Sequence, residues 1–97
     1  MAYKSKFQSA QTDQLFDAIL ALENKEECYR FFEDLLTIKE LQAMGQRWDV
    51  ACMLHEGHTY NEIVEETKAS AATISRVNKC LSYGADGYNT LFKKLNK

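Results

Sequence analysis

The segment from residue 59 to residue 81 constrains the fold most, because it contains two helix starts separated by one short break. Thr59 and Glu62 form a Thr-x-x-Glu capping box, which predicts a helix beginning at Tyr60. Ser70 follows the break and is a good N-cap for a second helix. The apolar positions of that second helix recur at helical spacing, at Ile74, Val77 and Leu81. Together these signals predict a helix-turn-helix over residues 59–83.

The outward positions of the second helix are short or hydrogen-bonding, as a helix that lies in the major groove of DNA requires. The residues that we expect to face DNA, from the turn onward, are Lys68, Ser70, Ala71, Ala72, Thr73, Ser75, Arg76 and Lys79. A plain helical hairpin that never meets nucleic acid is the alternative. One residue departs from the motif: Lys68 stands in the turn where glycine is usual, at a position that often needs positive φ.

The formal net charge of −2 conceals an uneven distribution along the chain. Residues 1–67 carry thirteen acidic and six basic side chains, whereas residues 68–97 carry one acidic and six basic side chains. A basic segment that begins at the helix-turn-helix is the electrostatic pattern that contact with phosphates needs. For the last few lysines alone, an ordinary solvated surface explains the charge better.

Composition indicates one all-α domain of 97 residues, because the chain has no proline and only four glycines. No apolar run reaches the length of a membrane span, and the first residues lack the apolar core of a secretory signal. Cys28, Cys52 and Cys80 are odd in number and form no C-x-x-C pattern. We therefore expect three small buried thiols in a reducing compartment, the cytoplasm.

The remaining helices follow from capping residues and apolar spacing. We expect a flexible arm over residues 1–11 and three dimerisation helices within residues 12–56. The first of these is capped by Thr12 and runs to about Glu23, and the second is capped by Asn24 and runs to about Leu35. The third begins at Ile38, after a capping box formed by Thr37 and Glu40, and is closed by Gly57. Gly84 ends the helix-turn-helix, and a last amphipathic helix spans residues 86–96.

The apolar content is too large for a monomer of this length to bury. Five Phe, five Tyr and one Trp accompany many Leu and Ile residues, and the first two expected helices have wide apolar faces. An obligate homodimer formed through these helices would cover that surface. A symmetric dimer also suits a DNA reader, because two recognition helices then meet two half-sites.

Two stretches carry a resemblance to a known family. The run Leu-Leu-Thr-Ile-Lys-Glu-Leu-Gln-Ala-Met-Gly-Gln-Arg at residues 35–47, followed by Ala-Thr-Ile-Ser-Arg at residues 72–76, resembles the Trp repressor family. The similarity covers roughly residues 12–95 and is greatest to the bacterial Trp-repressor-like proteins of the YerC/YecD group. It implies an intertwined all-α dimer that represses transcription by binding double-stranded operator DNA.

The resemblance also implies a ligand pocket. In the family the indole of the corepressor lies between two arginines, which Arg47 and Arg76 match, and Thr37 matches a threonine near the polar end of the ligand. Two positions depart from the family pattern. Val77 replaces a glycine beside the ligand, and Cys80 replaces a serine near its amino group. Tryptophan is therefore an unlikely effector, and an apolar side chain could fill the site. Arg76 is read more simply as a phosphate contact, and Arg47 as the partner of a surface acid.

Catalytic and cofactor chemistry have little support in the sequence. We find neither a catalytic triad pattern nor a glycine-rich phosphate loop, and the acidic residues spread along helix surfaces. His55 and His58 flank Glu56, but they are better read as interacting with a helix C-terminal dipole than as metal ligands. We therefore expect a DNA-binding transcriptional regulator, a repressor, with neither cofactor nor membrane partner. Whether a small-molecule effector binds, and which one, stays open at this point. The alternative is a protein-interaction module built on the same helical dimer without DNA binding.

Overall fold

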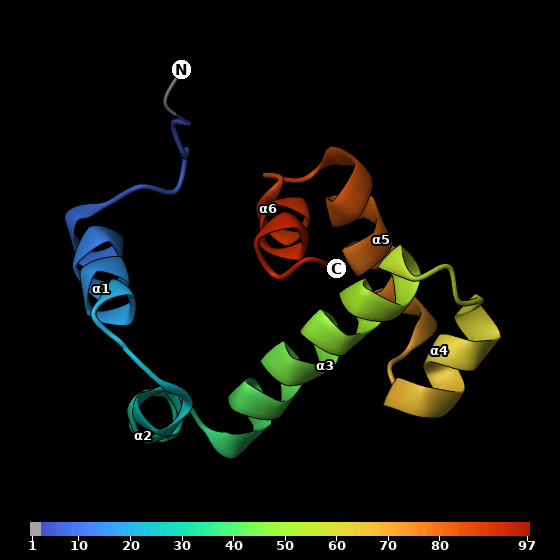
Figure 1. Ribbon diagram of the computed structural model, residues 1–97, viewed down its shortest axis with the longest axis horizontal. Coiled ribbons are helices and arrows are strands. Elements are labelled where there is room, and N and C mark those ends of the chain that lie inside the picture. Colours follow the sequence, from blue (N-terminus) through green and yellow to red (C-terminus); the bar gives the residue numbers. More distant parts are fainter. Residues whose placement is uncertain (1–2) are drawn as a thin grey trace. The chain divides into compact units, whose positions relative to one another are not determined.

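The computed structural model describes residues 3–97, which form six helices and no strand (Figure 1). The helices are α1 (Ala10–Leu20), α2 (Lys25–Leu35), α3 (Ile38–His55), α4 (Tyr60–Thr67), α5 (Ala71–Tyr83) and α6 (Gly87–Lys94). The prediction of an all-α fold is confirmed. Met1 and Ala2, the start of the predicted arm, lie outside the described residues. The chain divides into two compact units, Met1–Thr37 and Ile38–Lys97.

The first unit consists of α1 and α2, and the start of α1 differs from the prediction. The Ser9 hydroxyl accepts a hydrogen bond from the Thr12 backbone N–H at 3.1 Å, so Ser9 is the N-cap and Thr12 already lies in the first turn. The helix ends at Leu20, earlier than predicted. The prediction for α2 is confirmed, because the Asn24 side chain accepts from the Glu27 N–H at 2.9 Å.

The apolar side chains of the first unit are largely uncovered. Within the described part of the chain, no residue of α1 or α2 is fully buried. The side chain of Leu20 is 82% exposed, and those of Phe16 and Tyr29 are also more than half exposed. Full burial of one such side chain contributes about 1.5–3 kcal/mol. These two helices therefore present apolar area that the chain itself leaves in contact with water.

The second unit contains the core. Helix α3 packs against α4 and α5, α4 packs against α5, and α5 packs against α6. Helices α4, α5 and α6 gather around the C-terminal part of α3 (Figure 1). Every helix of the unit contributes to the core, which consists of Val50, Ala51, Met53, Ile63, Ala69, Ile74, Val77 and Phe92. None of the helices in residues 3–97 combines the length and apolar character needed to cross a membrane.

Glycines close two helices for different reasons. Gly57 has a φ of 90°, and the N–H of the following His58 donates to the Met53 carbonyl at 3.1 Å, which forms the helix-ending motif predicted there. Gly84, the C-cap of α5, is required by close approach. A Cβ at this position would lie 2.4 Å from the carbonyl oxygen of Cys80. The backbone can make this turn only because residue 84 has no side chain.

The cysteines differ from the expectation of three buried thiols. Cys28 and Cys52 are half-buried, and Cys80 is exposed, although all three are free. Cys80 is exposed because it lies on the flank of α5 beside an open groove that Trp48 and Tyr88 also line. Partial burial raises the pKa of the Cys52 thiol, so this side chain stays neutral near pH 7.

Replacing Gly84 with alanine should destabilise the protein. The new methyl group would collide with the Cys80 carbonyl, and overpacking of this kind costs about 1–3 kcal/mol. Gly87→Ala is the matched control, because nothing lies within 4 Å of a Cβ built at that position. Denaturant unfolding measures both variants. Equal free energies of unfolding for the two variants would contradict the steric account.

Candidate nucleic-acid interface

The first helix of the helix-turn-helix, α4, begins with the predicted capping box. The Thr59 N–H donates to a Glu62 carboxylate oxygen at 2.8 Å, and the Glu62 N–H donates to the Thr59 hydroxyl at 3.2 Å. His58 Nδ1 lies 3.6 Å from the same Glu62 oxygen. The hydrogen bond from the Thr59 N–H lowers the pKa of Glu62, and the Thr59 side chain and His58 lower it further. Glu62 is therefore held in its charged form at the start of α4.

The turn between α4 and α5 places a lysine in the left-handed conformation that usually requires glycine. Lys68 has a φ of 61° and a ψ of 15°, the left-handed region, and its N–H donates to the Val64 carbonyl at 2.9 Å. Gln46 of α3 donates to the Thr67 carbonyl at 3.0 Å, and the Thr67 hydroxyl accepts from the Ala69 N–H at 3.1 Å. These bonds satisfy the end of α4 and offset the strain of a non-glycine residue, about 1 kcal/mol.

The start of α5 is fixed as predicted. The Ser70 hydroxyl accepts from the Thr73 N–H at 3.1 Å and donates to the Thr73 hydroxyl at 3.1 Å. Farther along the helix, the Asn78 amide donates to the Tyr60 hydroxyl at 3.1 Å and ties α5 to α4. The cap therefore fixes where α5 begins, and the Asn78–Tyr60 hydrogen bond links α5 to α4, on which Ile63 is buried.

Four residues of α5 share one solvent-exposed face, which we call the outer face of α5. They are Ala72, Ser75, Arg76 and Lys79, spaced at i, i+3, i+4 and i+7. The opposite side of the helix carries Ile74 and Val77, which are buried in the core. Burial of those two residues thus fixes which side chains of α5 face outward.

The other predicted DNA-facing residues surround the beginning of α5. Lys68, Ser70 and Ala71 are exposed. Thr73 is half-buried, because it turns toward the side of the helix that faces α3 and its hydroxyl takes part in the cap. Thr73 is therefore less free to contact a partner than the outer face of α5.

Four of the five residues predicted for a ligand pocket line one cavity. The cavity has a volume of about 100 Å³ and is lined by Arg47, Thr73, Arg76, Val77, Cys80 and Tyr88. We call it the arginine cavity. Thr37, the last residue of the first unit, is exposed and is not one of the lining residues. Val77 is only 2% exposed and belongs to the core, so it both borders the cavity and supports α5.

Sequence reasoning missed Tyr88 as a residue of this cavity, because its helical position marks only an apolar side chain of the last helix. The Tyr88 ring stacks on Trp48, with 6.1 Å between centroids and 25° between planes. Partial burial raises the pKa of the Tyr88 hydroxyl, Cys80 adds to that increase, and Arg47 and Arg76 oppose it. The ring therefore stacks on the indole of α3 and also lines the cavity that the two arginines share.

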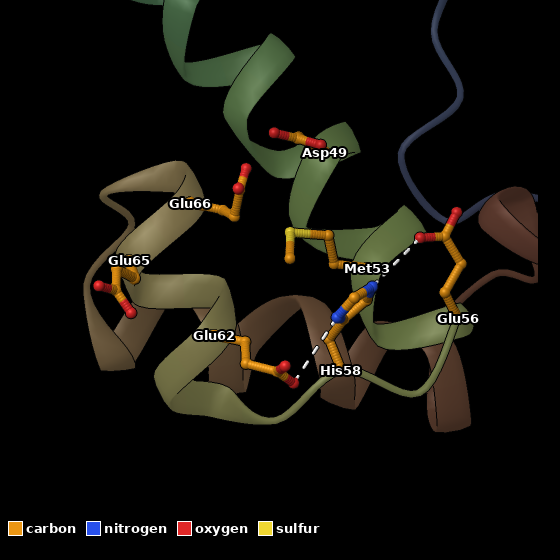
Figure 2. A pocket seen from close by; sticks show the side chains of 7 residues that line it. All are labelled: Asp49, Met53, Glu56, His58, Glu62, Glu65 and Glu66. Atoms are coloured by element: carbon orange, nitrogen blue, oxygen red, sulfur yellow. Dashed lines mark ion pairs between the residues drawn. The ribbon is translucent and has the colours of Figure 1, made fainter.

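An acidic groove between α3 and α4 also escaped prediction. Its volume is about 580 Å³, and its lining residues are Asp49, Met53, Glu56, His58, Glu62, Glu65 and Glu66. Figure 2 shows carboxylates on both helices, with His58 between Glu56 and Glu62. Among residues 3–97, no group of His, Cys, Asp and Glu side chains is arranged to hold a metal ion. This groove places negative charge on the side of α4 that faces α3.

Glu62 should make part of the stability depend on pH. Its pKa is lower in the folded chain than its ordinary value of 4.5, so its contribution is complete above that value and is lost as pH falls through the folded-state pKa. Glu62→Ala should therefore lower the melting temperature at pH 7 and differ less from the wild type in acid. Glu62→Gln should keep most of the cap without this pH dependence.

Glu65→Ala, which removes a carboxylate of α4 outside the capping box, is the control for the same melting curves. If Glu65→Ala and Glu62→Ala showed the same pH dependence, the capping box would not be its source.

Comparisons with known proteins agree with this geometry. The family model of the Trp repressor protein matches residues 10–96. The protein YerC of Bacillus subtilis (strain 168), described as uncharacterized, is 52% identical over 92 residues, which are 95% of this chain and 88% of YerC.

Two solved structures share the fold. One is the crystal structure of a candidate Trp repressor from Staphylococcus aureus, with a TM-score of 0.90, 50% identity, and coverage of 94% of this chain and 91% of the other. The second is a TrpR-like protein from Eubacterium eligens ATCC 27750, with a TM-score of 0.90, 50% identity, and coverage of 94% of both chains. The match over most of the chain confirms the resemblance in the sequence, and the chain belongs to the Trp repressor family.

Proposed function

We propose that the protein is a sequence-specific DNA-binding regulator of transcription, a repressor that binds operator DNA as a homodimer. The outer face of α5 carries this proposal, because it combines small and hydrogen-bonding side chains with two cations on one exposed side of a well-capped helix. Membership of the Trp repressor family supports it. The three free cysteines fit a reducing compartment, and we place the protein in the cytoplasm.

Each residue of the outer face has a chemical role in this proposal. The Ser75 hydroxyl can donate to or accept from a base edge, and the Ala72 methyl can contact the methyl group of thymine. Arg76 and Lys79 contact phosphates on the walls of the groove. Lys68, Ser70 and Ala71 lie at the N-terminus of α5, where backbone N–H groups and a cation favour a further phosphate. Thr73 lies at the flank of this surface.

The distribution of charge supports one orientation on DNA. The acidic groove would repel the phosphate backbone, whereas the segment that begins at Lys68 attracts it. Docking through α5 therefore keeps the carboxylates of the acidic groove away from the phosphates of the duplex.

The dimer in this proposal is supported by the uncovered apolar side chains of α1 and α2. Phe16, Leu20 and Tyr29 are more than half exposed in the chain by itself, and together they leave large apolar side chains of both helices uncovered. A second copy would cover them and would supply the second recognition helix. The wide apolar faces thus serve assembly of the DNA reader.

We also propose that tryptophan is not the effector. The arginine cavity holds about 100 Å³, whereas sites for small organic ligands commonly hold about 300–1,000 Å³. Val77 narrows the cavity and, as a core residue, has no room to withdraw. Cys80 offers a weak donor in place of a hydroxyl that could bind the ligand's amino group.

Binding to DNA selected from a random pool tests the proposal. Lys79→Ala should weaken binding to selected and unrelated DNA alike and reduce the slope of log affinity against log salt by about one. Ser75→Ala should instead reduce the preference for the selected sequence, by about 1–3 kcal/mol for a lost base contact. Fluorescence anisotropy over a salt series measures both effects.

Lys93→Ala is the control, because it removes a cation from α6 and leaves α5 unchanged. Binding by all three variants that matches the wild type would show that α5 is not the reader. Salt-insensitive binding to a protein, with none to DNA, would favour the interaction-module alternative.

The dimer makes a separate prediction. Sedimentation at micromolar concentration should give twice the mass of one chain, and Leu20→Lys should shift the species toward monomer, because it places a charge in an apolar interface. In a monomer the same change would be nearly neutral, since Leu20 is 82% exposed there. Gln14→Lys, a change of an exposed polar residue of α1, is the control. A folded wild-type monomer would refute the dimer.

A further inference from the structure

We propose that Tyr88 is a permanent occupant of the arginine cavity, which positions Arg76 for DNA without any small-molecule effector. This inference rests on the proposed function, because it concerns how the DNA-reading helix is held ready. It assigns Tyr88 as a positioning residue that acts through Arg76. It also implies that the arginine cavity can accept an aromatic ligand only in a variant that lacks the Tyr88 ring.

The Tyr88 ring lies at the arginine cavity and is supported by other aromatic rings. Tyr88 comes from α6, but it lines the same small cavity as Arg47 of α3 and Arg76 of α5. Its ring also stacks on Trp48, which in turn contacts the buried Phe92 ring at a centroid distance of 5.3 Å. Phe92 belongs to the same helix as Tyr88. The phenol is therefore supported from behind by packed aromatic rings and does not swing freely in the solvent.

Hydrogen bonds of Asn89 fix the start of α6 to α5. The amide of Asn89, next to Tyr88, donates to the carbonyl of Leu81 at 3.1 Å and to the carboxylate of Asp86 at 3.0 Å. The first of these bonds ties the residue beside Tyr88 directly to the last part of α5. The start of α6 is thereby fixed to the helix whose arginine shares the cavity with Tyr88.

Arg76 connects the arginine cavity with the outer face of α5. Arg76 belongs to the outer face of α5 and also lines the arginine cavity, so it stands at the border between the two. Arg47 and Arg76 both act to lower the pKa of the Tyr88 hydroxyl, which agrees with their place beside Tyr88 in the lining of the cavity. A guanidinium confined by the walls of a small cavity has fewer conformations to lose when it contacts a phosphate.

The volume that remains in the arginine cavity beside Tyr88 is small. With the Tyr88 ring in place, only about 100 Å³ is left among these residues, less than a further aromatic ring and its polar groups would need. Removing the ring would join this space to the apolar groove of about 640 Å³ that Tyr88 also lines. An apolar cavity made by truncating a side chain can bind a small aromatic compound. The vacated site should therefore accept the missing phenol ring as a free molecule.

Chemical rescue tests the proposal with p-cresol, which has the structure of the tyrosine side chain. Trp48, the only tryptophan, reports on the site through its fluorescence. We expect a saturable fluorescence change when p-cresol is added to Tyr88→Ala, at concentrations that leave the open groove beside Trp48 in the wild type unoccupied and its fluorescence unchanged. If only about a tenth of the variant is competent for DNA, its affinity falls about tenfold, and p-cresol should restore most of that loss.

Three controls separate ring filling from general stability. Tyr88→Phe keeps the ring and should bind DNA like the wild type without p-cresol. Tyr83→Ala removes an exposed tyrosine of α5 and should respond to p-cresol in neither assay. Tyr88→Leu, which retains more apolar contact than alanine, receives the same titrations in case Tyr88→Ala unfolds.

The outcomes are distinct. A folded Tyr88→Ala that ignores p-cresol, or that binds DNA like the wild type, would overturn the proposal. So would a wild type that binds L-tryptophan with micromolar affinity and then gains affinity for DNA. If the wild type binds no selected DNA, the proposed function and the positioning role of Tyr88 fail together. Fluorescence then still decides whether the ring fills the cavity.

Discussion

The packing of α5 against the C-terminal part of α3 is the constraint on which the rest of the second unit depends. Ile74 and Val77 of α5 are buried with Val50 and Ala51 of α3, and Ile63 of α4 completes the contact. Because an α-helix repeats every 3.6 residues, burial of one side of α5 leaves one defined set of side chains outside. The surface that we propose to meet DNA is thus a consequence of the core.

Local signals in the sequence predicted most of this unit. Thr59 and Glu62, Ser70, and Gly57 act through neighbours within a few residues, so their roles can be read from the sequence alone. The unusual Lys68 was also identified in advance, because the turn needs a left-handed residue whatever its side chain.

The errors arose where several local solutions were available or where tertiary contacts decide. Ser9 and Thr12 are both good caps, and only the structure shows that Ser9 is used. The exposure of Cys80 and the placement of Tyr88 depend on how α6 returns to α3, which no local pattern reports. The same holds for the acidic groove, because its residues, which come from α3, α4 and the short loop between them, meet only through the packing of the two helices.

The proposed function requires two copies of α5 to read two half-sites of one operator. Hydroxyl-radical footprinting on a duplex selected by the protein tests it most directly. As in helix-turn-helix dimers generally, Trp repressor among them, we expect two protected regions related by two-fold symmetry and centred about 34 Å apart, one turn of the duplex. A single protected region, or uniform weak protection that disappears with modest salt, would contradict it.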